Sequence, residues 1–415
     1  MSTQSQPHRT FGPDFVLDLE DPAYIQNPYP TYQWLREHAP AYRWRAHADA
    51  VVFTRHPDVR ALVFDRRFTN DYRQWEFAQE ARWPAEHAEY KAVIDHGLFA
   101  LSDENHLRVR KLVSGAFTPR AAERMRGEVQ ATVDHLIDTH ARGPRFNLTA
   151  ITESLPITVI SDMLKIPTEL RADFREFGLA VVRSSILFNN AERMFELIAP
   201  MPRWLGMLRG VIEARRAQPL ENDLLSTLIA AQEEGHKLSE IELISIVQAM
   251  IAAGSDTTVH AANWAFHTLL THPDQLALLR AEPTLLRNAV EECLRYDLFG
   301  KTGVPRFAKE ALEFAGVALR KGQMVIPHIP AALRDGEVFA EPDRFDIRRD
   351  VSQTIAFGGG QHFCLGAAVA RMQLDTVIGT IVRRFPTMKL ADKPEFQPHP
   401  LMRAMSRLDV TVDGA

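Results

Sequence analysis

The loop at residues 357–366, which reads FGGGQHFCLG, holds the side chain best suited to metal chemistry, the thiol of Cys364. Three successive glycines let the backbone ahead of it turn tightly and let a flat ligand come close. A helical pattern of apolar residues starts just after the cysteine, so free N–H groups and the helix dipole favour the thiolate. A thiolate in such a loop suits the strongly donating axial ligand of a haem iron.

Two other interpretations of this loop stay open from the residues alone. A free cysteine usually packs as a small apolar side chain, and glycine-rich loops before helices are common. A zinc site on His362 and Cys364 is less favoured, because no second pair of cysteine or histidine residues follows at ligand spacing.

A carboxylate and a hydroxyl, Asp256 and Thr257, form a second candidate for chemistry in the segment AAGSDTT at residues 252–258. A glycine inside a helix costs about 1 kcal/mol relative to alanine, and hydroxyl groups there can bond back to the i−4 carbonyl and bend the helix. A weak point at the middle of a helix indicates a purpose other than stability. We interpret Asp256 and Thr257 as a pair that passes protons to a bound oxygen species. Ala253 and Gly254 would leave room for a flat cofactor or substrate, and the alternative is a kinked helix with a satisfied buried aspartate.

The helix that carries this pair must be long. It starts at a capping box formed by Ser239 and Glu242 and stops before Pro273. At 1.5 Å per residue it would span roughly 50 Å, so we expect it to cross the middle of the molecule. Two histidines of this helix match no ligand pattern and are assigned to packing or to the surface: His260 and His267.

The remaining pattern predicts a mainly α protein with a minor β part. Residues 104–273 are almost wholly helical, with breaks at prolines. Short strands, with a hairpin candidate at 315–322, lie between residues 306 and 327. We expect one domain over residues 1–415, with a flexible N-terminal segment at residues 1–20.

The composition of the chain narrows its function class. The 415 residues are 46% hydrophobic and 24% charged, as in ordinary globular enzymes, and a net charge of −5 gives no sign of a nucleic-acid partner. Two cysteines, Cys293 and Cys364, make no disulfide framework and fit a reducing compartment. The polar N-terminus lacks a signal-peptide pattern, and no uncharged apolar run reaches ~18 residues. We therefore expect a soluble cytoplasmic protein with no membrane span.

Several charged residues recur at spacings that could bind carboxylates. Glu292 and Arg295 lie three residues apart on one helix face, and Arg344 could complete a bidentate network with them. The cations that would suit the carboxylates of a cofactor are His106, Arg110 and Arg306. Taken alone, each of these charges is typical of a solvated surface.

Taken in chain order, these pieces resemble the cytochrome P-450 family, and closely its soluble bacterial members. The matching residues of the cysteine loop are Phe357, Gly360, His362, Cys364 and Gly366. The resemblance extends over essentially the whole chain, from about residue 21 to the end. It implies the cytochrome P-450 fold, with haem b between the long central helix and the cysteine-loop helix.

The resemblance also implies a role for each matched residue. Cys364 resembles the iron ligand, and Asp256 and Thr257 resemble the acid–alcohol pair that delivers protons to dioxygen at the haem. The contacts to the haem propionates would be His106, Arg110, Arg306 and His362. The structural network beside the cysteine loop would be Glu292, Arg295 and Arg344. The implied reaction is monooxygenation, with electrons from NAD(P)H through separate redox proteins.

The chain departs from the family pattern in two places. Thr354 stands three residues before Phe357, where many bacterial members have a histidine that faces a propionate. That propionate would be held more weakly here, or by another group. Residues 297–304, which line the substrate pocket in the family, lack a common proline and carry Lys301, so the shape of the pocket stays open.

The resemblance places the substrate pocket beside an aromatic-rich segment, residues 68–101. Large aromatic side chains suit an apolar ligand. We therefore expect a hydrophobic or amphipathic substrate such as a fatty acid, terpenoid, steroid or polyketide. The expected pocket residues are Phe99, Ala253, Thr302, Gly303, Val304 and Met402.

The chain carries no flavin or iron–sulfur module, so we expect a ferredoxin-type electron donor with its reductase, and a monomeric enzyme. A basic docking patch would comprise Arg108, Lys111 and Arg371. Three other functions stay open: a peroxygenase, a haem-thiolate isomerase or dehydratase, and a non-enzymatic haem or ligand-binding protein. The first two would not need Asp256 and Thr257, and the third would bind haem and ligand without turnover.

Overall fold

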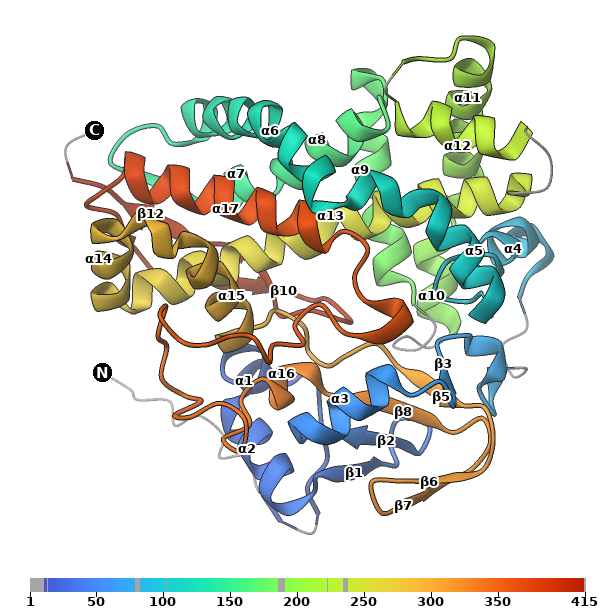
Figure 1. Ribbon diagram of the computed structural model, residues 1–415, viewed down its shortest axis with the longest axis horizontal. Coiled ribbons are helices and arrows are strands. Elements are labelled where there is room, and N and C mark those ends of the chain that lie inside the picture. Colours follow the sequence, from blue (N-terminus) through green and yellow to red (C-terminus); the bar gives the residue numbers. More distant parts are fainter. Residues whose placement is uncertain are drawn as a thin grey trace.

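The computed structural model describes residues 11–413 except 13, 79–82, 102, 186–190, 222 and 234–237. Most helices gather in the upper part of the molecule in Figure 1, and the largest sheet lies in the lower part with short helices from the start of the chain. This arrangement confirms the predicted mainly α fold with a minor β part. The single domain over residues 1–415 stays a prediction.

Helix α13 (Glu240–Thr271) crosses the helical part and is the longest helix among the described residues. Its 32 residues span about 48 Å at 1.5 Å per residue. The predicted capping box is present: the Ser239 hydroxyl accepts from the Glu242 N–H, and the Glu242 carboxylate accepts from the Ser239 N–H at 2.8 Å. The helices that pack on it include α8 (Ser154–Met163), α9 (Arg171–Arg183), α15 (Leu286–Tyr296) and α17 (Ala367–Arg384).

Two glycines allow close contact between α13 and its neighbours. A Cβ added to Gly178 of α9 would lie 2.8 Å from the Ser255 Oγ of α13. A Cβ added to Gly254 of α13 would lie 3.3 Å from the Ile160 side chain of α8. The open side of Gly254 therefore faces a neighbouring helix, and the expectation that it makes room for a cofactor or substrate is wrong.

The largest sheet joins strands from residues 41–69 to strands from residues 306–327. Its strands, in spatial order, are β1 (Ala41–Trp44), β2 (Ala50–Phe53), β8 (Met324–Pro327), β5 (Arg306–Ala308) and β3 (Phe68–Thr69). Strands β2 and β8 run parallel, and the other neighbours run antiparallel. Helix α3 (His56–Phe64) packs on β8 and on the 3₁₀ turn η7 (Gly360–His362), so it joins the sheet to the cysteine loop.

The predicted hairpin is present and starts slightly earlier than expected. Strands β6 (Leu312–Phe314) and β7 (Val317–Leu319) are joined by Ala315 and Gly316. These two residues have φ angles of 48° and 76°, which match the two positive values of a type I′ turn.

The remaining elements complete the two parts of the molecule. The other helices are α1 (Pro22–Gln26), α2 (Tyr29–His38), α4 (Ala88–Asp95), α5 (Asp103–Ser114), α6 (Pro119–His140), α7 (Thr149–Thr152), α10 (Ala191–Ile198), α11 (Met201–Ala217), α12 (Leu224–Glu233), α14 (Pro273–Ala281) and α16 (Ile329–Ala332). The other strands are β4 (Arg145–Asn147), β9 (Lys389–Leu390), β10 (Glu395–Gln397), β11 (Ala404–Arg407) and β12 (Asp409–Thr411).

The first described residues pack against the lower part of the molecule. Leu17 and Leu19 are buried in a core cluster with Tyr24. The expectation of a flexible segment over residues 1–20 is therefore wrong for this portion, and residues 1–10 and 13 lie outside the described residues. Across the part of the chain that the structure describes, no helix has both the length and the apolar character needed to cross a bilayer.

Candidate active site

The cysteine loop turns sharply before helix α17. Gly358 and Gly360 have φ angles of 73° and 64°, which favour glycine. The Cys364 N–H donates to the Phe357 carbonyl oxygen at 3.0 Å and closes the turn. The predicted tight turn is therefore confirmed, and Cys364 comes just before Gly366, the N-cap residue of α17.

The same glycines let the loop lie against the end of α3. A Cβ added to Gly359 would lie 2.6 Å from the Phe64 ring, and one added to Gly360 would lie 2.7 Å from the Val63 carbonyl oxygen. The loop is thus held both by its own turn and by a neighbouring helix. At these two glycines, the close approach is made by α3.

The Cys364 side chain is exposed, yet burial raises the pKa of its thiol. A backbone hydrogen bond from Gly366 and the charges of Arg110 and Arg371 oppose the effect of burial and favour the thiolate. This donor set fits a metal such as a haem iron.

Helix α13 also has solvent-accessible residues near its centre. Ala253 is exposed at the centre of the helix, although Ala252 and Ser255 beside it are buried. Thr257 lies one turn further on, is half-buried, and donates its hydroxyl to the Ala253 carbonyl oxygen at 2.9 Å. This is the predicted bond back to the i−4 carbonyl. The face of Ala253 and Thr257 therefore borders a space that a ligand can fill.

Helix α5 brings two of the predicted cations onto the cysteine loop. The ring centroids of His106 and His362 lie 4.3 Å apart, and Arg110 donates to the Phe363 carbonyl oxygen at 2.5 Å. His106 is fully buried. The structure therefore brings His106, Arg110 and His362 together beside the exposed thiol.

Arg306 is a buried cation that fits an anionic ligand. It is the first residue of β5 and is 6% exposed. Burial lowers its pKa to about 10, and no carboxylate among the described residues opposes that effect. A buried charge without a partner is costly, so a cofactor carboxylate would stabilise it.

Asp256 is buried, and its carboxylate lies between two histidines. His399 Nε2 lies 2.9 Å from Asp256 Oδ2, and His260 Nε2 lies 3.1 Å from Oδ1. Burial alone would raise the pKa of Asp256, but the hydrogen bond with His399 and the close contact with His260 hold it far below its usual range. Asp256 is therefore an anion, and its side chain is almost fully buried.

Sequence reasoning overlooked both histidines. The assignment of His260 to packing or to the surface misses its contact with Asp256, which their spacing of four residues on one helix could have indicated. His399 lies between β10 and β11, and no local pattern connects it with α13. His267 contacts the Trp264 ring, as expected of a packing residue.

Glu292 and Arg295 form a fully buried bidentate pair. Arg295 Nε and Nη2 donate to the two Glu292 carboxylate oxygens at 2.7 and 2.9 Å. The second arginine on this carboxylate is Arg349, whose Nε donates at 3.1 Å. The prediction of Arg344 in this place is wrong, because its side chain is 58% exposed.

Local surface carboxylates explain the error at Arg344. Its side chain forms ion pairs with Glu341 at 2.7 Å and Asp346 at 2.6 Å, both close in the chain. Arg344 still supports the network through its backbone, since its carbonyl oxygen accepts from Arg349 at 2.8 Å.

Exposure varies along residues 301–304, which belong to the predicted substrate stretch after α15. Val304 is 51% exposed and Thr302 half-buried, whereas the Lys301 ammonium is buried and lies 2.6 Å from the Glu20 carboxylate. Lys301 therefore points toward the N-terminal segment. Gly303 lies directly on β8, where a Cβ would come within 2.0 Å of the Pro327 carbonyl oxygen.

The other predicted pocket residues differ in exposure. Phe99 is 56% exposed, and Ala253 is exposed as described above. Met402 is buried, and its backbone pairs with Gly300 in an isolated bridge. This bridge ties the C-terminal segment to the stretch that carries Thr302 and Val304.

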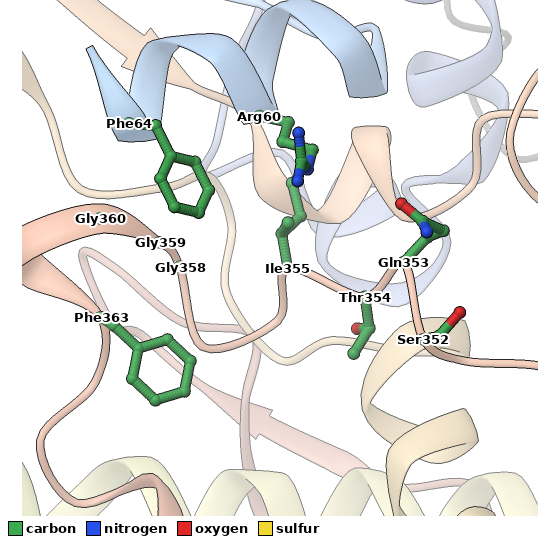
Figure 2. Close-up of a pocket in the computed structure, with 10 residues that line it drawn as sticks. All are labelled: Arg60, Phe64, Ser352, Gln353, Thr354, Ile355, Gly358, Gly359, Gly360 and Phe363. Atoms are coloured by element: carbon green, nitrogen blue, oxygen red, sulfur yellow. The ribbon is translucent and has the colours of Figure 1, made fainter.

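Figure 2 shows a pocket between α3 and the cysteine loop, which sequence reasoning did not anticipate. Its volume is about 380 Å³. Arg60 and Phe64 of α3 form one wall, and Thr354 and Phe363 lie on the loop side. The Thr354 hydroxyl accepts from the Ala356 N–H at 3.4 Å. Thr354 is thus engaged in a local turn.

Two of the three expected docking cations are paired within the chain. Arg108 forms an ion pair with Glu242, and Arg371 forms one with Glu291. Lys111 is exposed on α5. These pairs reduce the net positive charge that the expected patch offers to a partner.

Comparison with known proteins defines the family. A family model described as cytochrome P-450 matches residues 22–411. The epothilone C/D epoxidase of Sorangium cellulosum is 41% identical over 413 residues, which cover 98% of each chain. The 6-deoxyerythronolide B hydroxylase of Saccharopolyspora erythraea is 33% identical over 408 residues, which cover 96% of this chain and 99% of that enzyme. A solved structure of an epothilone B-bound cytochrome P-450 has a TM-score of 0.90 and 40% identity, and covers 96% of this chain and 100% of that chain.

The chain therefore belongs to the cytochrome P-450 family and has its fold. It is a monooxygenase of this haem-binding family, as the named epoxidase and hydroxylase relatives are. The resemblance of the cysteine loop, the acid–alcohol helix and the buried glutamate–arginine pair to this family is confirmed at the level of the whole chain.

Proposed function

We propose that the chain binds haem b and that the Cys364 thiolate would hold its iron. The observation that carries the proposal is an exposed thiol at the end of the glycine turn, with His106, Arg110 and His362 gathered at the same loop. The glycine turn and the Gly366 backbone hold the sulfur, and Arg110 and Arg371 favour its charge. When bound, the haem supplies dioxygen activation, which a thiolate ligand favours.

The haem carboxylates bind to cations on both sides of the site. Arg306 supports this assignment most strongly, since it is buried and no carboxylate among the described residues faces it. His106, Arg110 and His362 form the second group, beside the cysteine loop. The Thr354 hydroxyl accepts from the Ala356 N–H, which leaves its own O–H group as the donor at this position.

Thr257 supplies the proton that dioxygen cleavage needs. Its hydroxyl lies on the accessible face of α13 and can turn from the Ala253 carbonyl oxygen toward a ligand. Asp256 stands next to it in the chain and keeps its negative charge inside the protein. Together they form the catalytic pair, with Thr257 as the group that faces the reacting oxygen.

The substrate is an apolar small molecule of the polyketide class, which the enzyme hydroxylates or epoxidises. The names of the relatives, an epothilone epoxidase and a 6-deoxyerythronolide B hydroxylase, support this class. Phe99, Ala253 and Val304 offer exposed apolar surface for such a ligand. Electrons come from NAD(P)H through a ferredoxin-type protein and its reductase, with Lys111 on the docking face.

The ligand assignment is tested by the absorption spectrum of the reduced carbon monoxide complex. We expect the wild type to show the band of thiolate-ligated haem and Cys364→Ser to lose it. Cys293→Ser is the matched control, because Cys293 is buried and its pKa is raised well above the usual value by burial. Retention of the thiolate band in Cys364→Ser would contradict the assignment.

The substrate class is tested by titrating haem-loaded enzyme with macrolactone polyketides, steroids and long-chain fatty acids while following the haem absorption shift. We expect macrolactones to give the tightest binding and an oxygenated product with a ferredoxin and its reductase. Tighter binding and faster turnover with the fatty acids or steroids would move the substrate to another class.

A further inference from the structure

The two ring nitrogens of His399 have different partners. Nδ1 accepts from the backbone N–H groups of Leu401 and Met402, at 3.1 and 3.0 Å. Nε2 lies 2.9 Å from Asp256 Oδ2. Because two backbone donors occupy Nδ1, the ring proton must reside on Nε2, and His399 donates it to the carboxylate.

This arrangement keeps His399 neutral. A second proton, on Nδ1, would face the two N–H donors and lose both hydrogen bonds. The ring is fully buried, and burial lowers its pKa. A neutral donor on Oδ2 favours the ionised form of Asp256, because a carboxylate accepts the bond more strongly than a protonated carboxyl group does.

Three other groups complete the surroundings of this pair. His260 approaches Asp256 Oδ1 from the same helix at 3.1 Å. Its Nδ1 is buried and has no hydrogen-bond acceptor among the described residues. Arg183, the last residue of α9, adds a positive charge that acts on His399. The third is Thr257, the next residue on α13.

His399 also shapes the segment that carries a pocket residue. The N–H of Met402 binds its Nδ1, and the same residue forms the backbone bridge with Gly300. The Leu401 carbonyl oxygen accepts from the Lys301 N–H at 2.9 Å. One imidazole thus joins the acid of α13 to the loop beside the predicted substrate stretch.

We propose that His399 is a positioning residue for the proton path: it holds the Asp256 carboxylate ionised and turned toward the C-terminal segment, which leaves Thr257 as the group that faces the ligand. This inference rests on the proposed function, since it assigns a support to the acid–alcohol pair. The contact between His399 and Asp256 arises from tertiary packing, and no motif near residue 399 predicts it.

Two conservative variants separate the two bonds of His399. In His399→Gln the amide nitrogen can reach the place of Nε2 and still donate to Asp256. In His399→Asn the amide oxygen can reach the place of Nδ1 and accept from the loop, but the donor to Asp256 is lost. His267→Gln serves as a control, because His267 lies on α13 together with Asp256.

The first measurement is coupling, the fraction of NAD(P)H electrons that reach product. Proton transfer by a positioned side chain raises the rate of such reactions by at least about a hundredfold. We therefore expect His399→Asn to lower coupling roughly tenfold or more, to release hydrogen peroxide, and to change the solvent isotope effect. His399→Gln and His267→Gln should stay within about threefold of the wild type. Equal coupling in His399→Asn and the wild type would overturn the proposal.

The second measurement does not depend on turnover. Infrared spectra of the wild type should lack the carbonyl band of a buried protonated carboxyl at weakly acidic pH. The band should appear in His399→Asn and vanish again in His399→Asn combined with Asp256→Asn. Its absence from His399→Asn at every pH would show that His399 does not keep Asp256 ionised. Failure of the wild type to bind haem through thiolate would instead overturn the proposed function, and would leave this infrared result unaffected.

Discussion

The cysteine loop and the acidic centre of α13 belong to one candidate site but are built in different ways. The loop closes through residues close in the chain, with the Cys364 N–H on the Phe357 carbonyl oxygen. The acidic centre is completed by His399, which lies 143 residues beyond Asp256. A contiguous motif carries its geometry in its own backbone, whereas a buried carboxylate takes its state from whatever tertiary packing brings to it.

The largest effect on stability should come from the ion pairs of Glu292. There Arg349, 57 residues further along the chain, supplements the local pair of Glu292 and Arg295. Arg349→Ala removes one of the two arginines on the fully buried Glu292 carboxylate. Breaking a buried ion pair costs about 3–5 kcal/mol, and since Arg295 remains we expect the lower end of that range in the free energy of unfolding. Urea denaturation measures it. Arg344→Ala should change stability by less than about 0.5 kcal/mol, and the reverse order would restore Arg344 to the network.

The glycine loop offers a test of purely local geometry. Gly360→Ala places a Cβ at a φ of 64° and 2.7 Å from the Val63 carbonyl oxygen. Left-handed strain and overpacking together should cost about 3 kcal/mol and reduce the thiolate-ligated fraction. Gly358→Ala is the matched control, with a φ of 73° and open space around the Cβ. It should cost only about 1–2 kcal/mol, so equal losses would show that α3 does not constrain the loop.

The contribution of Asp256 to the free energy of unfolding should depend on pH. Asp256→Asn replaces a buried anion that accepts from His399 and contacts His260, so we expect a loss of about 1–3 kcal/mol at neutral pH. Because the pKa of folded Asp256 lies far below its usual value, this contribution is complete above about pH 4 and is lost only as the pH falls further. Urea midpoints of both proteins from neutral pH down to the acid limit measure the difference. A difference that stays constant down to the acid limit would mean that folding does not lower the pKa of this carboxyl group.

The smallest effect should come from Gly254. Alanine there gains about 1 kcal/mol of helix propensity, but its Cβ meets Ile160 at 3.3 Å. We expect a net change in stability within about 1 kcal/mol and unchanged substrate binding, because this side of α13 faces α8. Ala253→Leu provides the contrast, since it fills the accessible face and should weaken substrate binding in a spectral titration. Loss of binding in Gly254→Ala alone would place the ligand on the other side of the helix.

Sequence reasoning predicted the elements more fully than the contacts between them. The capping box of α13, the turn before Cys364 and the pairing of Glu292 with Arg295 all depend on residues within a few positions of each other, and all are confirmed. The expectation for Arg344 was wrong because Arg349 lies only five residues further along the chain, and only packing decides which of the two arginines enters the interior. The role of Gly254 was misread because a missing side chain does not specify which neighbour occupies the space.

The sequence by itself determined the family, the long helix and the residue types of the candidate haem site, because these rest on short-range backbone chemistry and periodic burial. The tertiary structure alone decided the partners of buried charges. Arg306 is buried without a described carboxylate, Lys301 turns to Glu20, and Asp256 is held by His399. The physical reason is that a charge in the interior must be matched by whatever group the fold places within hydrogen-bond reach, and that group can come from any part of the chain.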